Sequence, residues 1–225
     1  MELSQMTRGN TILLVCDVQK QARPMKIKVN ESVNTKKKIV DYKIFTILRA
    51  LEFSKIIGIP ILKSEQVFKK EWTSNSGEPI TYGETDKLIQ AFFNENEVPS
   101  IRAKEYKKTT LSMINDQIRF EIVGNSCESL FFNTKFAVIV GFETHLAVWK
   151  TCEDLKKLRI MPVILMDGVC SSKELDSDVC LKMMQKSYGM VVTTLEIWAH
   201  KFDVDENDAE FGEILKLFKG KLVKY

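Results

Sequence analysis

The chain has 225 residues, which is enough for one α/β domain with a sizeable core and few for two. Its 33 basic and 30 acidic residues give a net charge of only +3, and this balance does not by itself indicate a nucleic-acid-binding protein. Two histidines are too few for a metal site with three histidine ligands. The five cysteines form no CxxC pair, which argues against a zinc finger or a disulfide framework and favours a reducing, cytoplasmic setting.

Membrane and targeting segments are not expected. The N-terminal stretch MELSQMTRGN is polar and lacks the apolar core of a signal peptide. The apolar runs also fall short of the ~18–20 residues that a membrane-spanning helix needs. We therefore expect a protein that does not associate with a membrane.

The first half of the chain alternates apolar strands with helices. The run TILLVCD is almost continuously apolar and ends in an aspartate, as is typical of a buried parallel strand. In chain order we predict a strand at 11–17, a helix over 35–57, a strand at 59–62, a loop over 64–84, a helix over 85–93 and a strand at 98–103.

The second half repeats this alternation. Residues 111–135 show no clear pattern beyond one or two short helices around Gly124. The predicted elements that follow are a strand at 136–140, a helix over 143–158, a strand at 162–166, a helix over 176–187, a strand at 190–193 and a helical remainder that includes 210–220. Such alternation predicts a parallel sheet with helices on both faces.

Candidate functional residues are those that follow the strands, because ligands of open parallel sheets bind beyond the carboxyl ends of the strands. Four groups stand at such ends: Asp17 and Gln19; Ser64, Glu65 and Gln66; Lys104, Lys107 and Lys108; and the run from Gly141 to Ala147.

Four of these segments carry a family resemblance. The motifs VCDVQ (15–19), KKTTLSM (107–113), GFETHLAV (141–148) and DGVCSS (167–172) resemble the isochorismatase-like hydrolase family, and within it the eukaryotic isochorismatase domain-containing proteins. The resemblance implies one domain over 1–225, with a core of about 10–220. It also implies a three-layer α/β/α Rossmann-like sandwich with six parallel strands in the order 3-2-1-4-5-6, and a homo-oligomer.

The same resemblance implies a set of catalytic positions. Asp17 falls on the general base and Lys108 on the assisting cation, with Lys107 as the alternative if the register slips by one residue. A cis peptide between Phe142 and Glu143 is implied, with oxyanion donors at the N–H groups of Glu143 and Ala147. The nucleophile position, where the family has cysteine, is Ala147.

Alanine cannot act as a nucleophile, so covalent thiol catalysis is not expected from this position. Cys152 lies five residues further along the same helix and is rotated by ~140° from it. Cys16 precedes Asp17 on a strand and points to the opposite face. We interpret all five cysteines as buried hydrophobes or surface thiols. A replacement of a natural cysteine by alanine is the alternative explanation of Ala147.

The resemblance also bears on binding. Nicotinamidases of the family carry histidine ligands after the second strand, whereas the stretch KSEQVFKKEW here has none, so we expect neither a metal nor a cofactor. Gln19, Glu65, Gln66 and His145 are predicted to contact a substrate. We interpret His145 as a pocket-rim or interface residue rather than an acid–base catalyst.

Three hypotheses of function follow. The first is a catalytically impaired or inactive pseudoenzyme that keeps a small-molecule pocket. The alternative is an active hydrolase of a small amide, imide or enol ether, acting through Asp17 and water. The third is a scaffold or RNA-associated protein. Nucleic-acid binding is not favoured, because the lysine runs are dispersed among acidic residues and no recognition motif accompanies them.

Overall fold

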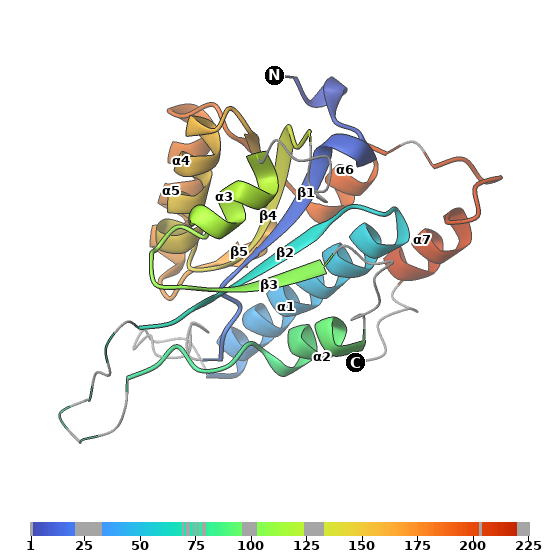
Figure 1. The fold of residues 1–225 in the computed structure, drawn as a ribbon. Coiled ribbons are helices and arrows are strands. Elements are labelled where there is room, and N and C mark those ends of the chain that lie inside the picture. The colour runs from blue at the N-terminus through green and yellow to red at the C-terminus, as the bar shows by residue number, and fades with distance from the viewer. Residues whose placement is uncertain are drawn as a thin grey trace.

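One six-stranded parallel sheet forms the centre of the molecule (Figure 1). The computed structural model describes residues 2–20, 33–68, 70, 73, 75, 77, 80–95, 103–123, 133–202 and 204–219. Its strands are β1 (Thr11–Cys16), β2 (Ile61–Gln66), β3 (Ala103–Lys108), β4 (Phe136–Phe142), β5 (Met161–Cys170) and β6 (Val191–Thr193). They lie in the order β3-β2-β1-β4-β5-β6, so the predicted strand order is confirmed.

Helices cover both faces of the sheet, which confirms the predicted three layers (Figure 1). One face carries α1 (Val33–Ile56), α2 (Lys87–Glu95), α6 (Leu195–Ala199) and α7 (Phe211–Phe218); the other carries α3 (Asp116–Val123), α4 (Trp149–Lys157) and α5 (Glu174–Lys186). Three short turns complete the set: η1 (Leu3–Gln5), η2 (Arg8–Asn10) and the π-helical turn η3 (Thr144–Val148). None of the helices within the described ranges is long and apolar enough to cross a membrane.

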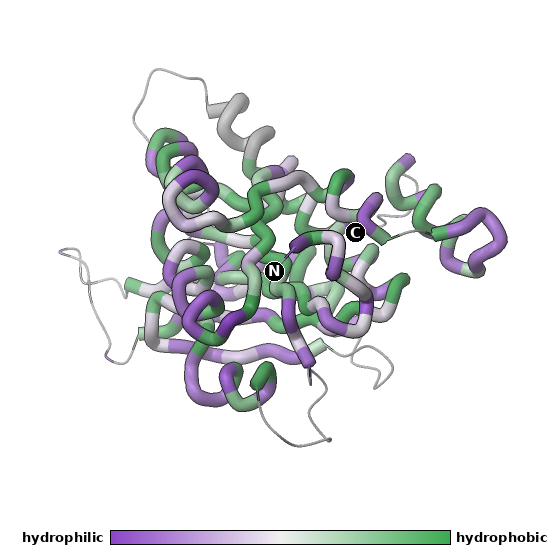
Figure 2. The backbone as a smooth tube through the Cα atoms, turned by 90° about the horizontal axis from the view of Figure 1, so that it is seen from above, coloured by the Kyte–Doolittle hydropathy of each residue, from purple (hydrophilic) through white to green (hydrophobic). Residues whose placement is uncertain are grey.

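The central strand β1 shows why the sheet is buried on both sides. Leu13 and Val15 pack in the cluster beneath α1, whereas Ile12 and Leu14 pack in the cluster beneath α4 and α5. All four are fully buried, and each such side chain contributes about 1.5–3 kcal/mol of transfer free energy. Figure 2 accordingly shows mostly hydrophobic strands through the centre, and helices that alternate between hydrophobic and hydrophilic residues.

Several boundaries differ from the predicted ones. The third strand occupies 103–108 rather than 98–103, and residues 98–102 lie outside the described ranges. Its sequence, AKEYKK, is charged because β3 is an edge strand with partly exposed side chains. β5 continues to Cys170, four residues beyond the predicted end, past a register irregularity against β4. The unclear stretch 111–135 contains α3 in its described part.

The segment after β1 is fastened to the segment before α2. The backbone N–H of Asp86 donates to the carbonyl of Val18 at 2.7 Å, and that of Lys20 donates to Glu84 at 2.9 Å. Gln19 and Thr85 form an antiparallel bridge between these bonds. The carboxyl end of β1 is therefore held against a segment almost seventy residues away in the sequence.

The end of β4 requires a glycine. Gly141 has a φ of 129°, and a Cβ at this position would lie 2.0 Å from the carbonyl oxygen of Cys16 on β1. Only a residue without a side chain allows the two central strands to approach this closely.

We predict that Gly141→Ala lowers the free energy of unfolding by about 4 kcal/mol or more, because the backbone of β1 must move to admit the methyl group. Gly212→Ala in α7 is the matched control, since nothing lies within 4 Å of its added Cβ, and a gain of about 0.5–1 kcal/mol is expected there. Urea unfolding measures both. Equal stability of the two variants would contradict the prediction.

Candidate functional site

A buried ion pair joins the carboxyl ends of the first and third strands. Asp17 follows β1 in a left-handed conformation, with a φ of 47°, which aspartate tolerates better than most residues. Its Oδ2 lies 2.6 Å from Nζ of Lys108, the last residue of β3. The Oγ of Ser64 on β2 donates to Oδ1 at 2.8 Å. Three neighbouring strands thus converge on one carboxylate.

Lys108 is fully engaged. Its ammonium donates to Oε1 of Gln66 at 2.6 Å and to the carbonyls of Thr110 and Leu111 at 3.0 and 2.9 Å, in addition to its ion pair with Asp17. The structure therefore pairs Asp17 with Lys108, and not with the neighbouring Lys107.

Burial dominates the electrostatics of this pair. It raises the pKa of Asp17, while the charge and hydrogen bond of Lys108 and the hydrogen bond from Ser64 offset part of that rise. A buried pair of charges is stable only when its remaining hydrogen-bonding capacity is satisfied, and here Ser64, Gln66 and two backbone carbonyls do so.

The two glutamines that were predicted to bind substrate form hydrogen bonds within the protein. The Oε1 of Gln19 accepts from the backbone N–H of Gln66 at 2.8 Å, and its Nε2 donates to the carbonyls of Gln66 and Gly83. Gln19 thereby clamps β2 to the segment before α2. The Oε1 of Gln66 is held by Lys108.

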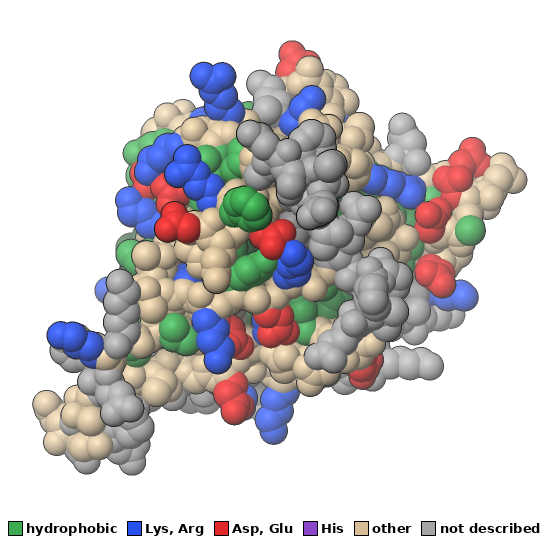
Figure 3. Space-filling view, in the orientation of Figure 1, with side chains coloured by type: hydrophobic (Ala, Val, Ile, Leu, Met, Phe, Trp, Pro, Cys, Tyr) green, Lys and Arg blue, Asp and Glu red, His purple; other side chains and the backbone are tan. Residues whose placement is uncertain are grey.

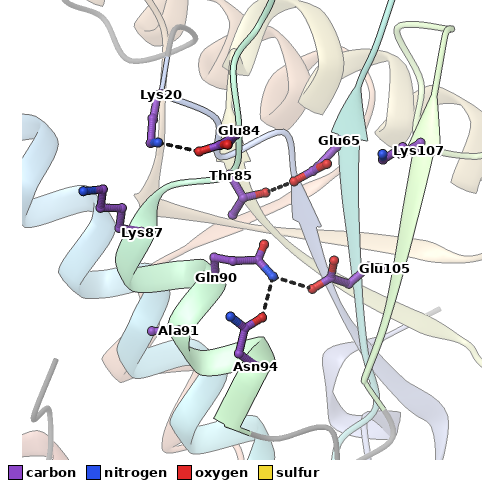
Figure 4. Close-up of a pocket in the computed structure, with 10 residues that line it drawn as sticks. All are labelled: Lys20, Glu65, Glu84, Thr85, Lys87, Gln90, Ala91, Asn94, Glu105 and Lys107. Carbon is purple, nitrogen blue, oxygen red and sulfur yellow. Dashed lines mark hydrogen bonds and ion pairs between the residues drawn. The ribbon is translucent and has the colours of Figure 1, made fainter.

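Glu65 lies away from the ion pair, in a cleft between α2 and the edge of the sheet (Figure 4). The cleft measures about 590 Å³ and is lined by charged and amide side chains, including Glu105, Lys107 and Gln90. Glu65 accepts a hydrogen bond from Thr85, and the buried Lys63 lies 3.6 Å from it. Alternation along β2 explains the separation, because consecutive residues point to opposite faces.

Ala147 is almost buried in η3, the turn between β4 and α4. Its carbonyl accepts a hydrogen bond from Oγ1 of Thr151 at 2.7 Å. The expected cis peptide between Phe142 and Glu143 is not formed, because the peptide bonds of the described residues are all trans. The trans form is the lower in energy by roughly 2.5–4 kcal/mol for a bond not followed by proline.

The described cysteines do not take the place of a nucleophile. Cys16 lies on the opposite face of β1, with its Sγ 3.4 Å from Sδ of Met113. Burial raises the pKa of Cys16 and of Cys170 to about 12, that of Cys180 to about 11, and that of Cys152 well above its ordinary value. These thiols stay protonated near neutral pH. Cys127 lies outside the described residues.

His145 belongs to a cluster that the motifs alone did not reveal. Its Nδ1 lies 2.9 Å from Oγ of Ser171, the residue that follows β5, and 3.6 Å from Oε2 of Glu143. That carboxylate accepts hydrogen bonds from the backbone N–H and the hydroxyl of Ser172. We expected Glu143 to act through its backbone, and the structure shows that its side chain is anchored as well.

Two aromatic residues of the predicted loop were also missed. Phe68 and Tyr82 stack with their ring centroids 4.9 Å apart. Burial raises the pKa of Tyr82, and the charges of Asp17 and Glu143 raise it further. The phenol thus lies within electrostatic range of both acids. The only sequence signal was the presence of aromatic residues in an otherwise polar loop.

The isochorismatase domain model matches residues 11–196. The chain belongs to the isochorismatase family. The secreted isochorismatase effector Isc1 of Phytophthora sojae is 23% identical over 220 residues, which are 98% of this chain and 90% of that protein.

Solved structures show the same fold. One described as a MAR1 ribonuclease from Caenorhabditis elegans is 21% identical, with a TM-score of 0.71 over 95% of this chain and 92% of its own. The YcaC gene product of Escherichia coli, described as an octameric hydrolase of unknown specificity, is 12% identical, with a TM-score of 0.67 over 96% of this chain and 90% of its own. At these identities the likeness supports the isochorismatase-family fold and not a shared substrate.

We predict that Lys108→Met lowers the free energy of unfolding by about 3–5 kcal/mol, because it leaves a buried carboxylate unpaired. The loss depends on pH. Because the pKa of Asp17 is raised in the folded state, its contribution to the stability of the fold is most favourable at low pH and is lost as the pH rises. Removing Lys108 raises the pKa of Asp17 further and so increases this loss.

The destabilisation by Lys108→Met is therefore larger at about pH 8 than at about pH 5. Urea unfolding at the two pH values checks this, with Lys107→Met as the exposed control. A loss for Lys108→Met that is the same at both pH values would contradict the assignment.

Proposed function

We propose that this chain is a catalytically impaired member of the isochorismatase family, which keeps a small-molecule site at the Asp17–Lys108 pair but lacks thiol-dependent hydrolysis. The observation that carries the proposal is the methyl group of Ala147 at the position of the family's nucleophile. The raised pKa values of the described cysteines support it, because no thiolate is available nearby among them.

Hydrolysis through Asp17 and water is the second candidate. The raised pKa of Asp17 supports it, since a carboxyl group that holds its proton to higher pH can protonate the enol ether of a substrate such as isochorismate. This chemistry needs no covalent intermediate, so Ala147 does not prevent it.

The RNA-associated alternative has weaker support. Three of the structures with this fold are described as MAR1 ribonucleases. On the face that Figure 3 shows, however, basic and acidic side chains are interspersed rather than gathered in one basic patch. RNA binding would have to show a steep dependence on salt to support this alternative.

We also propose a homo-oligomer in the cytoplasm. An octameric protein with this fold and the exposed apolar side chains of Leu175 and Ile197 support the oligomer. The unpaired thiols of the described residues support a reducing compartment.

The unaltered chain is predicted not to turn over a panel of small amides and isochorismate. Ala147→Cys is predicted to gain a thiol that reacts with iodoacetamide at least about tenfold faster than the four described cysteines. In the proposed site Asp17 accepts the thiol proton and the charge of Lys108 stabilises the thiolate, whereas burial raises the pKa of the four described thiols. Peptide mapping locates the modified residue.

Asp17→Asn in the Ala147→Cys background is the control and is predicted to slow the labelling of residue 147. Turnover by the unaltered chain that disappears in Asp17→Asn would contradict the proposal and support the water-based hydrolase.

A further inference from the structure

We propose that Ser171 and His145 form a hydroxyl nucleophile and its general base, which accept acyl groups from small activated esters at the carboxyl ends of the strands, where the proposed function has no thiol nucleophile. The inference rests on the proposed function in one respect: residue 147 does not supply the nucleophile.

The geometry of the pair is that of a nucleophile and its base. Oγ of Ser171 accepts a hydrogen bond from the backbone N–H of His145 at 3.4 Å and lies 2.9 Å from Nδ1 of the same residue. In the tautomer of His145 that is protonated at Nε2, Nδ1 accepts the hydroxyl proton of Ser171, and we assign this tautomer to the ring. This is the arrangement in which a neutral imidazole can take a hydroxyl proton.

Glu143 supplies the charge that the base needs after it accepts a proton. Its Oε2 lies 3.6 Å from Nδ1, and the backbone N–H and hydroxyl of Ser172 fix the carboxylate there. The carboxylate lies near Nδ1, the nitrogen that binds the proton, and not near Nε2. It therefore acts through its charge and not by holding the ring in place through a hydrogen bond to Nε2. An ionised carboxylate at this distance attracts a positive charge on the ring.

The cluster shares its surroundings with the ion pair. His145 keeps about a quarter of its side chain exposed, whereas Asp17 and Lys108 are almost completely buried. The charges of Asp17 and Glu143 both act on the phenol of Tyr82, which places the two acids around one region. His145 is therefore the more accessible group, whereas the Ser171 that it contacts is itself buried.

The reaction balances without a metal or a redox partner. Oγ of Ser171 forms a bond to the acyl carbon while its proton moves to Nδ1 of His145. The proton then passes to the leaving alcohol as the acyl bond to that group breaks, which leaves an acylated Ser171. A water molecule, deprotonated by the same nitrogen, releases the acid and restores the serine.

The competing interpretation is that the contact between Ser171 and His145 only holds the turn η3 against the end of β5. Another serine of the chain provides a matched control for this interpretation. Ser177 on α5 donates a hydrogen bond to Oγ1 of Thr144 in the same turn η3, at 2.9 Å. Ser177→Ala removes a buried hydroxyl that anchors η3 but does not contact His145.

The test is acylation of the purified full chain with p-nitrophenyl acetate and, separately, with a sulfonyl fluoride, followed by peptide mapping. We expect modification of Ser171 in the unaltered chain and in Ser177→Ala. We expect none at this position in Ser171→Ala, and a rate at least about 100-fold lower in His145→Ala, where the hydroxyl remains but its base is gone. Circular dichroism confirms that the variants are folded.

Ser171→Cys provides a second readout. Its thiol is expected to react with iodoacetamide faster in the single variant than in the double variant Ser171→Cys with His145→Ala, and any change in packing caused by the cysteine is common to both variants. An unmodified Ser171 in the folded unaltered chain, or modification that His145→Ala leaves unchanged, would overturn the inference. If Ala147→Cys still gains its reactive thiol in that case, the proposed function stands without it. Conversely, acylation of Ser171 alongside turnover that depends on Asp17 overturns the proposed function alone.

Discussion

The ion pair between Asp17 and Lys108 is the constraint on which the rest of the site depends. Desolvating two charges is unfavourable, so the fold must return hydrogen bonds to both groups. It does so with Ser64 and Gln66 from β2 and with backbone carbonyls beyond β3. Each of these groups is in place only if β1, β2 and β3 end at the same level. The ion pair therefore fixes the register of β1, β2 and β3 at their carboxyl ends, in addition to any role that it has in a reaction.

Under the proposed function, the site keeps this ion pair without a nucleophile beside it, and its chemical capacity differs from that of a thiol hydrolase. The pair alone can polarise a bound molecule or donate a proton, and the methyl group of Ala147 contributes only packing. The inferred nucleophile lies two strands from β1, where Ser171 follows β5 and meets His145 from η3. The turn η3 carries both Ala147, the position that the proposed function assigns to the nucleophile, and His145, the base of the inferred one.

The sequence predicted the parts of this structure that follow from periodicity and motif. The apolar runs of β1 and β4 identified the central strands. The motifs placed Asp17 and Lys108 as a base and an assisting cation, and the structure pairs them at the carboxyl ends of β1 and β3. It failed where tertiary position overrides local pattern: β3 is charged because it is an edge strand, and Glu65 and Gln66 separate because a strand alternates its faces. The cluster of Glu143, His145, Ser171 and Ser172 depends on two distant segments meeting, which no local spacing reports.

The most direct test of the central claim is a double-mutant cycle with Asp17→Asn, Lys108→Met and the combined variant, measured by urea unfolding near neutral pH. If the pair organises the sheet edge, the two single losses are strongly coupled, by about 2 kcal/mol or more, and the combined variant is far more stable than their sum implies. Losses that add to within about 0.5 kcal/mol would contradict the account.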